Sequence, residues 1–458
     1  MTIAVIGAGT YGSYLIDALL KKHPDADITL FDVGDKTIKS EQEIGFYSSL
    51  KKARYRGLTD GRFFGFGGAS VKWGGQLLTY TDNDFHHPDG FMSDVIRFDM
   101  EYKDYMLSKF NIENKYSEKH ISDDLFTKTG VWLSALHHDF FKWFSIASRK
   151  QVKIIQNCRV VRLASADKKH IDAVIYLQDG IEQSQSFDYY FLTAGAFESA
   201  RILLSSKLTD GDKVFFSDHL SQKVFRIKGS TMIGDEDYIF RMKGTSLITK
   251  RMVGEINDCS FYIHPVYNLD FPFFESIKEV LFKKHFEWNY IWNIFKDIPN
   301  VIKFTWSVLI LRKMYVLNKE WYLYIDIENP TKNSYVTLSS EKDAFSVPGL
   351  DVNYYIDPKA ADIYNAAISI ATNHLVANGV QFDILSESID TKTCEDIYHP
   401  YGMFHFMNAE EYFNHWDNML LVSTGCLNRS GGINPTASMF PMIDEFILNH
   451  FSYSTKQK

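Results

Sequence analysis

The chain has 458 residues, of which 45% are hydrophobic and 23% are charged, and this balance predicts a folded protein with a large core and about three domain-sized units. Its formal net charge of −8 excludes the basic surface that a nucleic-acid partner requires. The cysteines are too scattered for a metal site or a disulfide framework, so we expect no metal and a reducing compartment; they are Cys158, Cys259, Cys394 and Cys426. Because the first predicted strand begins at residue 2, no room is left for a leader, and we expect a cytoplasmic protein.

The first predicted element is a short apolar strand that runs directly into Gly7. Gly7, Gly9 and Gly12 have the G-x-G-x-x-G spacing, and a helical pattern follows them. In this setting the glycines form a tight turn and let a pyrophosphate approach the backbone, and the helix N-terminus attracts the phosphates. The next strand ends in Asp32, 20 residues after Gly12, where a carboxylate can accept a hydrogen bond from an adenosine ribose. The unit predicts a bound dinucleotide, FAD or NAD, rather than an ordinary strand–helix–strand unit.

A charged segment at 36–54 predicts a helix and leads into a glycine-rich loop from Gly61 to Gly75. Six glycines in these fifteen residues exclude a helix or strand interior. The aromatic residues between them would be unfavourable on an exposed linker. The loop therefore predicts a buried cradle whose backbone passes close to a ligand.

Residues 98–110 and 133–146 predict helices that cover the space between domains. After them, residues 152–178 predict a meander of three strands. The strand at 187–192 ends in a small-residue turn that opens a helix, so this second strand–turn–helix unit can return to the first sheet beside the dinucleotide. Residues 222–265 predict further strands.

The segment 273–317 combines three tryptophans and many apolar residues with several lysines, and Pro299 divides it into two predicted helices. Its apolar run at 301–311 is far shorter than the roughly 20 residues that a membrane-spanning helix needs. We expect the segment to pack over the β-rich part of the chain. The alternative is a helix that lies on a membrane surface or docks on a partner.

The remaining sequence predicts a strand at 321–327, a hairpin after it, and a helix from Pro358 to Asn378. A short apolar strand at 419–422 and a turn at 430–435 precede a closing amphipathic helix.

Six of these segments, in this order, resemble motifs of the glucose–methanol–choline (GMC) family of flavoprotein oxidoreductases. They are GAGTYG with Asp32, GFGGASVKWGG, FLTAGAFESARILLSS, SDHL, ENPTKNSYVTLSSEKDAFSVPGL and DNMLLVSTGCLNRSGGINPT. The resemblance implies an α/β fold with a Rossmann-like FAD-binding domain and a second, antiparallel-sheet substrate domain. It divides the chain into a discontinuous FAD-binding domain (1–85, 150–225 and 395–458), a helical cover (86–149) and a substrate-binding domain (226–394).

The resemblance also implies that the dinucleotide is FAD. Lys72 stands next to Trp73, where some relatives carry a histidine that links covalently to the flavin, so we expect non-covalent FAD. The residues expected to contact FAD are Gly7, Gly9, Thr10, Tyr11, Gly12, Asp32, Gly67, Gly68, Ser70, Trp73, Gly74, Gly75, Val160, Ala194, Gly195, Gly425, Asn434, Pro435 and Thr436.

By the same resemblance, the enzyme oxidises a CH–OH group by passing a hydride to flavin N5. His399, in the sequence HPYG, corresponds to the histidine that takes the hydroxyl proton, and Asn434 corresponds to the second active-site residue. A histidine suits this role because it can accept a proton near neutral pH. His405 is a rival base.

We expect a small alcohol or carbohydrate as substrate, and residues 273–317 raise the alternative of a lipid-linked glycan at a membrane. The electron acceptor is left open among oxygen, a quinone and a redox protein. Two other functions are compatible with the motifs: a flavin-dependent isomerase, lyase or mutase without net oxidation, and a flavin-binding protein without turnover.

Overall fold

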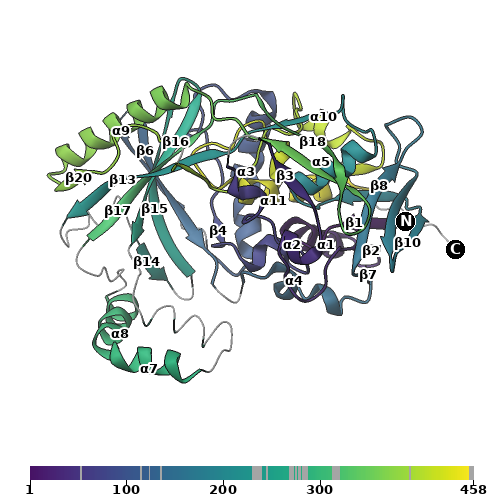
Figure 1. Cartoon of the computed structure of the whole chain (residues 1–458), viewed down its shortest axis with the longest axis horizontal. Coiled ribbons are helices and arrows are strands. Elements are labelled where there is room, and N and C mark those ends of the chain that lie inside the picture. The colour runs from purple at the N-terminus through teal and green to yellow at the C-terminus, as the bar shows by residue number, and fades with distance from the viewer. Residues whose placement is uncertain are drawn as a thin grey trace.

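A computed structural model describes the chain over residues 1–51, 54–113, 116–122, 124–134, 137–228, 240–243, 246–267, 273, 276, 280, 287–311, 320–390 and 393–452. Figure 1 shows a unit built on a parallel sheet beside a large antiparallel sheet, with a helical arm projecting from the antiparallel side.

The first strand lies at the centre of a five-stranded parallel sheet. The strand order is β22 (Met419–Leu421), β11 (Tyr189–Leu192), β1 (Thr2–Ile6), β2 (Asp27–Phe31) and β7 (Val152–Ile155). Ile3, Ala4 and Val5 are completely buried, as expected for an apolar strand covered on both faces. Because β1 pairs in parallel with both β2 and β11, the predicted return of the second unit to the first sheet is confirmed.

Three helices join remote parts of the chain, because α11 (Met439–Glu445) packs against both α1 (Thr10–Lys22) and α3 (Gly90–Ser108). Asp444 on α11 accepts a hydrogen bond from the Tyr14 hydroxyl on α1 at 2.6 Å. It also forms an ion pair at 2.6 Å with Lys109, at the end of α3, and both side chains are buried. A buried ion pair is tolerated where its groups are also hydrogen-bonded, as Asp444 is. This junction fixes the closing helix against the dinucleotide-type unit.

A ten-stranded antiparallel sheet forms the other half of the molecule. Its main order is β20 (Phe382–Ile384), β13 (His219–Lys228), β17 (Glu320–Glu328), β16 (Cys259–Tyr267), β15 (Ser246–Ile256), β6 (Leu125–Trp132) and β4 (Gln76–Leu77), with β14 (Phe240–Lys243), β21 (Glu395–Asp396) and β5 (Glu118–Ser122) attached to it.

The two faces of this sheet differ in chemistry. Ile263, Ile325 and Ile327 on one face are fully buried in a core shared with α9 (Ala360–Ala377). The register of paired strands places a set of polar side chains together on the opposite face. This polar face carries His219, Arg251, Tyr262, Asp326 and Glu328.

Smaller elements complete the fold. A four-stranded sheet has the order β12 (Val214–Phe216), β18 (Ser334–Lys342), β19 (Pro348–Asn353) and β3 (Ser48–Leu50). A three-stranded sheet contains β10 (Ile181–Gln185), β9 (Ala173–Gln178) and β8 (Cys158–Ala164). The remaining α-helices in the described part are α2 (Glu41–Ile44), α4 (Phe140–Trp143), α5 (Ala196–Ser205), α10 (Ala409–Phe413) and the two of the arm.

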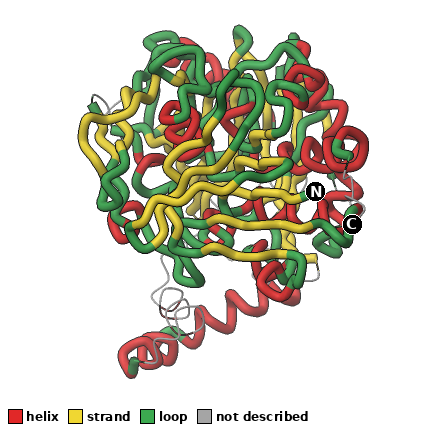
Figure 2. The backbone as a smooth tube through the Cα atoms, turned by 90° about the vertical axis from the view of Figure 1, so that its right-hand side faces the viewer, coloured by secondary structure: helices red, strands yellow, loops and turns green. Residues whose placement is uncertain are grey.

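The arm consists of α7 (Trp288–Lys296), α8 (Ile298–Thr305) and a single π-helical turn, η4 (Trp306–Ile310). Figure 2 shows it extending away from the rest of the protein. Pro299 lies in the first turn of α8, so the predicted division into two helices is confirmed. The expected packing over the β-rich part is wrong for 287–311, because none of the side chains described there is buried. The rest of 273–317, apart from residues 273, 276 and 280, lies outside the described residues.

Other sequence predictions need correction. Residues 36–54 do not form one helix: only α2 is helical, and Gly45 ends it with a left-handed conformation at φ 81°. Residues 152–178 do not form one meander, because β7 joins the parallel sheet while β8 and β9 pair elsewhere. Buried apolar strands have similar compositions in parallel and antiparallel sheets, so the sequence alone does not show which strand each one pairs with.

The helical cover expected at 86–149 is also wrong in part. The α3 helix confirms the helix expected from 98, but β6 joins the antiparallel sheet through β15 and β4. The helix expected at 133–146 is reduced to α4, because Asp139 starts it by accepting a hydrogen bond from the Lys142 N–H at 3.2 Å. Residues 135–136 lie outside the described residues. Over the described chain, no helix has the length and apolar character needed to cross a bilayer.

Candidate active site

A cavity of about 230 Å³ opens at the carboxyl ends of β1, β2 and β11. Ile6, Phe31 and Thr193 mark these strand ends in its wall. Open α/β sheets bind ligands at this edge, where the strand order reverses. The reversal occurs beside β1, which has β2 on one side and β11 on the other. The cavity therefore lies where a dinucleotide-type fold places its ligand.

The first turn of α1 faces this cavity through Gly9, Thr10 and Tyr11. Gly9 is the N-cap residue, no side chain in the described part caps the helix, and its first turn contains no acidic residue. A helix start of this kind presents backbone N–H donors and a partial positive charge. These residues therefore fit a phosphate group.

Two glycines allow strand and helix to approach this closely. Gly7 has φ +108°, and a Cβ there would lie 2.7 Å from the carbonyl oxygen of Thr193. A Cβ at Gly12 would lie 2.0 Å from the Gly7 oxygen. No side chain can replace either hydrogen without moving backbone, so the spacing of these glycines follows from packing.

The glycine-rich loop packs directly on this turn. The Gly67 N–H donates to the Ala8 oxygen at 2.9 Å. A Cβ at Gly68, where φ is +51°, would lie 2.9 Å from Gly9 Cα. Here the loop's glycines serve backbone contact with the first turn, and Gly68 also lines the cavity.

Asp32 lies at the end of β2 in the cavity wall. Its two carboxylate oxygens accept the N–H groups of Ala8 and Gly34, each at 2.8 Å. Burial raises the pKa of Asp32, while these two hydrogen bonds lower it in part. Each oxygen retains a further lone pair, so the carboxylate can both hold the turn and accept a ligand hydroxyl.

The structure brings ten of the predicted cofactor residues together. The cavity is lined by Gly7, Gly9, Thr10, Tyr11, Asp32, Gly68, Val160, Ala194, Gly195 and Thr436. The other nine lie outside its described lining: Gly12, Gly67, Ser70, Trp73, Gly74, Gly75, Gly425, Asn434 and Pro435.

Contacts within the protein explain some of these positions. The Ser70 hydroxyl donates to the Gly67 oxygen at 2.6 Å and accepts the Phe140 N–H at 3.2 Å. The Trp73 ring nitrogen donates to the His138 oxygen at 3.3 Å. The second half of the loop is therefore held against residues 138–140.

An ionic cluster that the sequence did not reveal borders the same cavity. Arg159 forms ion pairs with Glu198 and with Asp343, the latter at 2.9 Å. Arg201 donates to Glu198 at 2.7 Å. Burial raises the pKa of Glu198, but the charges of the nearby arginines, with Arg159 first, lower it overall. Glu198 is thus a carboxylate, and Arg159 brings a guanidinium to the cavity wall.

Asp218 holds two histidines in place. Its Oδ1 accepts the His219 N–H at 2.7 Å and the His399 N–H at 3.0 Å, and its Oδ2 accepts the Tyr55 hydroxyl at 2.6 Å. The His219 and His399 rings meet edge to face with 5.7 Å between centroids. One buried carboxylate therefore joins β13 to the loop that carries the predicted base.

The environment of His399 keeps its ring neutral. Burial lowers the pKa of His399 well below 6.5, and the neighbouring His219 and Arg251 lower it further. Within the described chain, its buried Nδ1 has no hydrogen-bond partner. A neutral imidazole with an unused ring nitrogen can exchange a proton with a ligand. His405, the rival, instead lines a second cavity of about 850 Å³.

The loop around His399 contains strained backbone and touches the first cavity. Tyr398 has φ +67°, which is unusual for a bulky residue. Tyr398 and Pro400 both line the cavity, so His399 is flanked by cavity residues on either side. Strain of this kind persists only where neighbouring contacts enforce it, here the Asp218 hydrogen bond to His399.

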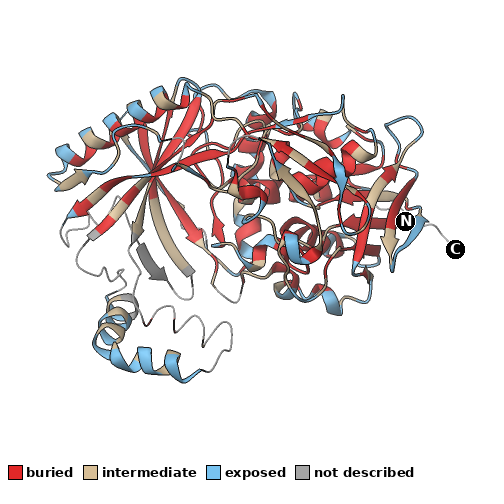
Figure 3. Cartoon of the chain, in the orientation of Figure 1, coloured by how far each residue is buried: buried red, intermediate tan, exposed pale blue. Residues whose placement is uncertain are grey.

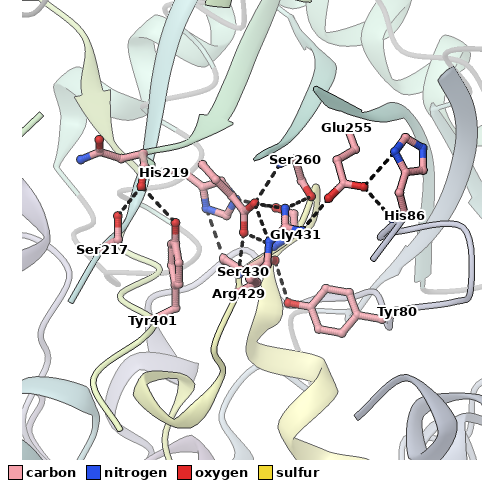
Figure 4. A network of polar contacts seen from close by, with 12 residues as sticks. Tyr80, His86, Ser217, His219, Glu255, Ser260, Tyr401, Arg429, Ser430 and Gly431 are labelled. Carbon is pink, nitrogen blue, oxygen red and sulfur yellow. Dashed lines mark hydrogen bonds and ion pairs between the residues drawn. The ribbon is translucent and has the colours of Figure 1, made fainter. Parts of the chain in front are cut away.

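A second anchored segment, residues 429–431, leads to Asn434 (Figure 4). Glu328 accepts the N–H groups of Ser430 and Gly431, each at 2.8 Å, and forms an ion pair with Arg429 at 2.5 Å. The Gly431 oxygen lies 2.7 Å from His219 Nε2. Burial raises the pKa of Glu328, but the charge of Arg429 and these hydrogen bonds lower it overall. The polar face thus holds this turn through its backbone.

Asn434 begins a 3₁₀ turn, with Pro435 at its first position. Its side-chain oxygen accepts the Thr436 N–H at 3.0 Å. Because the oxygen is used in this cap, the side-chain NH₂ is the group that can donate to a ligand. Thr436, two residues on, lines the cavity.

Sequence reasoning quoted SDHL as a motif but assigned no role to Asp218 or His219. Glu328 opens the quoted motif ENPTKNSYVTLSSEKDAFSVPGL but was likewise given no role, and no sequence signal pointed to Arg251. These residues lie on the polar face beside residues of other strands, and only the register of the paired strands shows which residues those are. Alternation along 320–328 could have indicated that Asp326 and Glu328 share a face.

Comparison with known proteins supports this fold. No protein-family model and no curated protein matches the sequence. Pyridoxine 4-oxidase from Mesorbium loti superposes with a TM-score of 0.56 at 13% identity, over 99% of this chain and 100% of that chain. The R554A variant of formate oxidase from Aspergillus oryzae RIB40, studied for FAD modification, gives 0.52 at 11% identity, over 97% of each chain. The expected fold class, a Rossmann-like unit with a second antiparallel-sheet part, is confirmed.

Proposed function

We propose that this chain is an FAD-dependent oxidoreductase that oxidises a CH–OH group. The observation that carries the proposal is convergence: the first turn of α1, the turn before α5 and the loop around His399 are remote in sequence and border one cavity. The GMC-like motifs support the proposal, and the similarity of fold to two oxidases is consistent with it.

The cavity residues fit FAD in three respects. The uncapped start of α1 suits the diphosphate, and Asp32 suits a ribose hydroxyl. Gly195, with φ +78°, has open space where a Cβ would point, so the backbone before α5 can lie against a ligand. Lys72 in place of a histidine supports non-covalent binding. When bound, FAD would supply the hydride acceptor.

His399 and Asn434 would act on the substrate hydroxyl. A neutral His399 takes the hydroxyl proton on a ring nitrogen, which makes the carbon a better hydride donor. The Asn434 NH₂ donates a hydrogen bond to the same oxygen and orients it. Asp218 and Glu328 do not touch the substrate in this scheme; they position His399 and the turn before Asn434.

We propose an alcohol, and more specifically a carbohydrate, as substrate. Trp132 on the polar face supports this class, because a flat ring packs well against a sugar face. We also propose the division into an FAD-binding part (1–85, 150–225, 395–458) and a substrate-binding part (226–394). In this division β4 and β6, which pair within the antiparallel sheet, would be counted with the substrate-binding part.

The first experiment is the absorbance spectrum of purified protein, native and after acid precipitation. We expect a flavin spectrum that leaves with the supernatant; flavin retained on the polypeptide contradicts non-covalent binding, and absence of flavin contradicts the proposal. The second is anaerobic mixing with a panel of alcohols and sugars. Bleaching of the flavin supports oxidation, and reoxidation by oxygen or a quinone identifies the acceptor. Turnover without any acceptor would indicate a hydride-returning isomerase, lyase or mutase instead. No bleaching by any substrate would indicate a non-catalytic flavoprotein.

A further inference from the structure

Arg251 is a buried cation on the polar face, outside the groups assigned above. It is 8% exposed, and its guanidinium donates to the neutral side-chain oxygen of Gln76. Its planar group also lies 4.5 Å from the ring centroid of Tyr262. Within the described chain, no carboxylate lies within ion-pair distance of it. A buried charge without an opposite charge is unfavourable unless another group neutralises it.

The other buried cations near these sites have such a partner. Lys128, directly opposite Arg251 on β6, pairs with Asp84, and Arg429 pairs with Glu255 and Glu328. Asp326 is the acidic residue of the polar face nearest in register, but its carboxylate binds His264 at 3.0 Å. The exception at Arg251 therefore needs its own explanation.

Arg251 lies close to the residues of the proposed chemistry, and its charge lowers the pKa of His399. A Cβ at Gly432 would lie 2.3 Å from Val253 Cγ1, so the turn leading to Asn434 packs on β15 two residues from Arg251. Tyr262, beneath the guanidinium, lies 5.7 Å from the His219 ring, which in turn meets His399. Gln76 follows the end of the glycine-rich loop. Arg251 is thus surrounded by the elements that carry the base, the amide and the loop.

We propose that Arg251 binds an oxyanion of the substrate, so that the enzyme oxidises an alcohol or sugar that also bears a carboxylate or phosphate. A guanidinium presents parallel N–H donors that match these groups. The substrate anion supplies the missing opposite charge, and its fixed distance from the hydroxyl orients the reacting carbon. This inference rests on the proposed function.

The test uses the holoenzyme and pairs of matched probes: glucuronate or glucose 6-phosphate against glucose, and glycolate against ethylene glycol. We expect the charged member of at least one pair to bleach the flavin anaerobically at lower concentration. The two anions distinguish carboxylate from phosphate. At one fixed pH, Arg251→Gln should weaken apparent binding of the charged probe about 10- to 100-fold more than that of the neutral probe. Lys250→Gln removes an equal charge on the other face of β15 and should leave the preference intact.

A binding measurement without turnover separates this inference from the proposed function. Calorimetric titration with acetate and with inorganic phosphate should show binding that Arg251→Gln abolishes. Equal response to charged and neutral probes in the parent, unchanged in Arg251→Gln, would overturn the anion site and leave alcohol oxidation standing. Anion binding that depends on Arg251, with no flavin bleaching by any alcohol, would support the site and contradict the oxidation.

The arm supports a second, independent inference. Its described side chains form an uncovered apolar surface, and Figure 3 shows the arm as exposed or intermediate, whereas the strands of both sheets are largely buried. Large apolar side chains are 40% to 74% exposed here, whereas soluble monomers rarely expose a contiguous patch above a few hundred Å². They are Trp288, Trp292, Phe295, Ile298, Ile302, Trp306, Ile310 and Leu311.

The apolar residues follow helical spacing. Trp288, Trp292 and Phe295 recur at intervals of four and three on α7, and Ile298, Ile302 and Trp306 recur every four residues from α8 into η4. Each set therefore lies along one side of its helix. An amphipathic helix with aromatic residues on one side is typical of segments that lie in a membrane interface.

Charge favours a lipid surface over a second copy of the chain. The sequence that includes the arm is basic: residues 268–319 contain eight lysines and arginines against five aspartates and glutamates, a net charge of +3, although the whole chain carries −8. Within 287–311 itself, Lys296 and Lys303 balance Glu287 and Asp297, so the excess positive charge lies in the sequence that flanks the arm. A cationic segment is attracted to anionic lipid headgroups, and two copies of it repel one another. We infer that the arm docks the protein on an anionic membrane surface, with its tryptophans at headgroup depth.

Vesicle flotation tests this inference with phosphatidylcholine alone and with added phosphatidylglycerol. We expect binding to the anionic vesicles that weakens with salt. The triple variant Trp288→Ser, Trp292→Ser and Trp306→Ser should lose this binding. The double variant Ile181→Ser and Met407→Ser removes equally exposed apolar residues from the body and should retain it.

Activity on soluble substrates and thermal unfolding should be unchanged in both variants, which shows that they fold. Light scattering after gel filtration tests the alternative that the arm binds a second copy of the chain. A dimer in the parent that the triple variant dissociates, with no vesicle binding, would overturn the membrane surface in favour of a second copy. Absence of both vesicle binding and self-association would overturn it as well.

Discussion

Replacing Glu328 with glutamine should weaken the fold and the site together, because one carboxylate serves four partners. Its Oε1 accepts the Ser430 and Gly431 N–H groups, and its Oε2 accepts the Ser260 N–H at 2.8 Å and the Arg429 guanidinium. In Glu328→Gln one of these oxygens becomes an NH₂ donor. If Oε1 is retained, the new NH₂ faces the Ser260 N–H and Arg429.

The loss of stability follows from the contacts that the variant removes. The variant loses two charge-assisted hydrogen bonds, from the Ser260 N–H and from Arg429, each worth about 1.5 kcal/mol. We therefore expect the free energy of unfolding to fall by about 3 kcal/mol. Glu255→Gln is the matched control, because Arg429 keeps Glu328 as its ion-pair partner and loses only the contact with Glu255 at 2.5 Å. Its loss should be near 1.5 kcal/mol.

Urea unfolding at one fixed FAD concentration measures both variants. The difference in the free energy of unfolding between the parent and Glu328→Gln should also depend on pH. Because Arg429 and the hydrogen bonds lower the pKa of Glu328 below its ordinary 4.5, the carboxylate stabilises the fold above that value. This contribution is lost as pH falls through the lowered pKa. Equal losses in the two variants, or no loss in Glu328→Gln, would refute the assignment of Glu328 as the anchor of the turn.

Three further predictions concern the site. His399→Ala should bind FAD normally but reduce it about 10²- to 10⁴-fold more slowly in anaerobic stopped flow, and equal rates would contradict its role as base. The acid limb of kcat/KM should lie below pH 6.5, because burial lowers the pKa of His399 most, His219 and Arg251 lower it further, and Asp326 opposes them. Arg251→Gln should therefore move this limb to higher pH. A limb at or above pH 6.5 that the variant does not move would contradict the assignment of His399. Gly12→Ala should prevent folding, because its Cβ would lie 2.0 Å from the Gly7 oxygen. Gly9→Ala should fold, because the nearest atom to its Cβ would be Gly68 Cα at 4.0 Å. If the two variants had the same circular dichroism and melting temperature, the close approach of strand and helix would be contradicted.

The fold of the first strand–helix–strand unit could be predicted because its signals are local. Gly7, Gly12 and Asp32 lie within one strand–helix–strand unit, and their spacing follows from how closely those elements must pack. The turn before α5 was recognisable for the same reason. The contacts of Ser70 and Trp73 with residues 138–140 were not, because they join a loop to a distant segment.

The substrate side depends on register, which the sequence does not state. Arg251 and Lys128 face one another only because β15 pairs with β6 at that position, and a shift of one residue would exchange the two faces of the strand. The same register places His219 opposite Glu328, and hence brings the histidine ring to the Gly431 oxygen while the carboxylate holds the Gly431 N–H. The pair His219 and Glu328 therefore contacts both the C=O and the N–H of Gly431, three residues before Asn434. His399 and Asn434 were proposed from motifs, whereas the pairing of β13 with β17 positions His219 and the turn before Asn434. Mutations that change this pairing should therefore impair the proposed oxidation without changing the lining of the cavity at the ends of β1, β2 and β11.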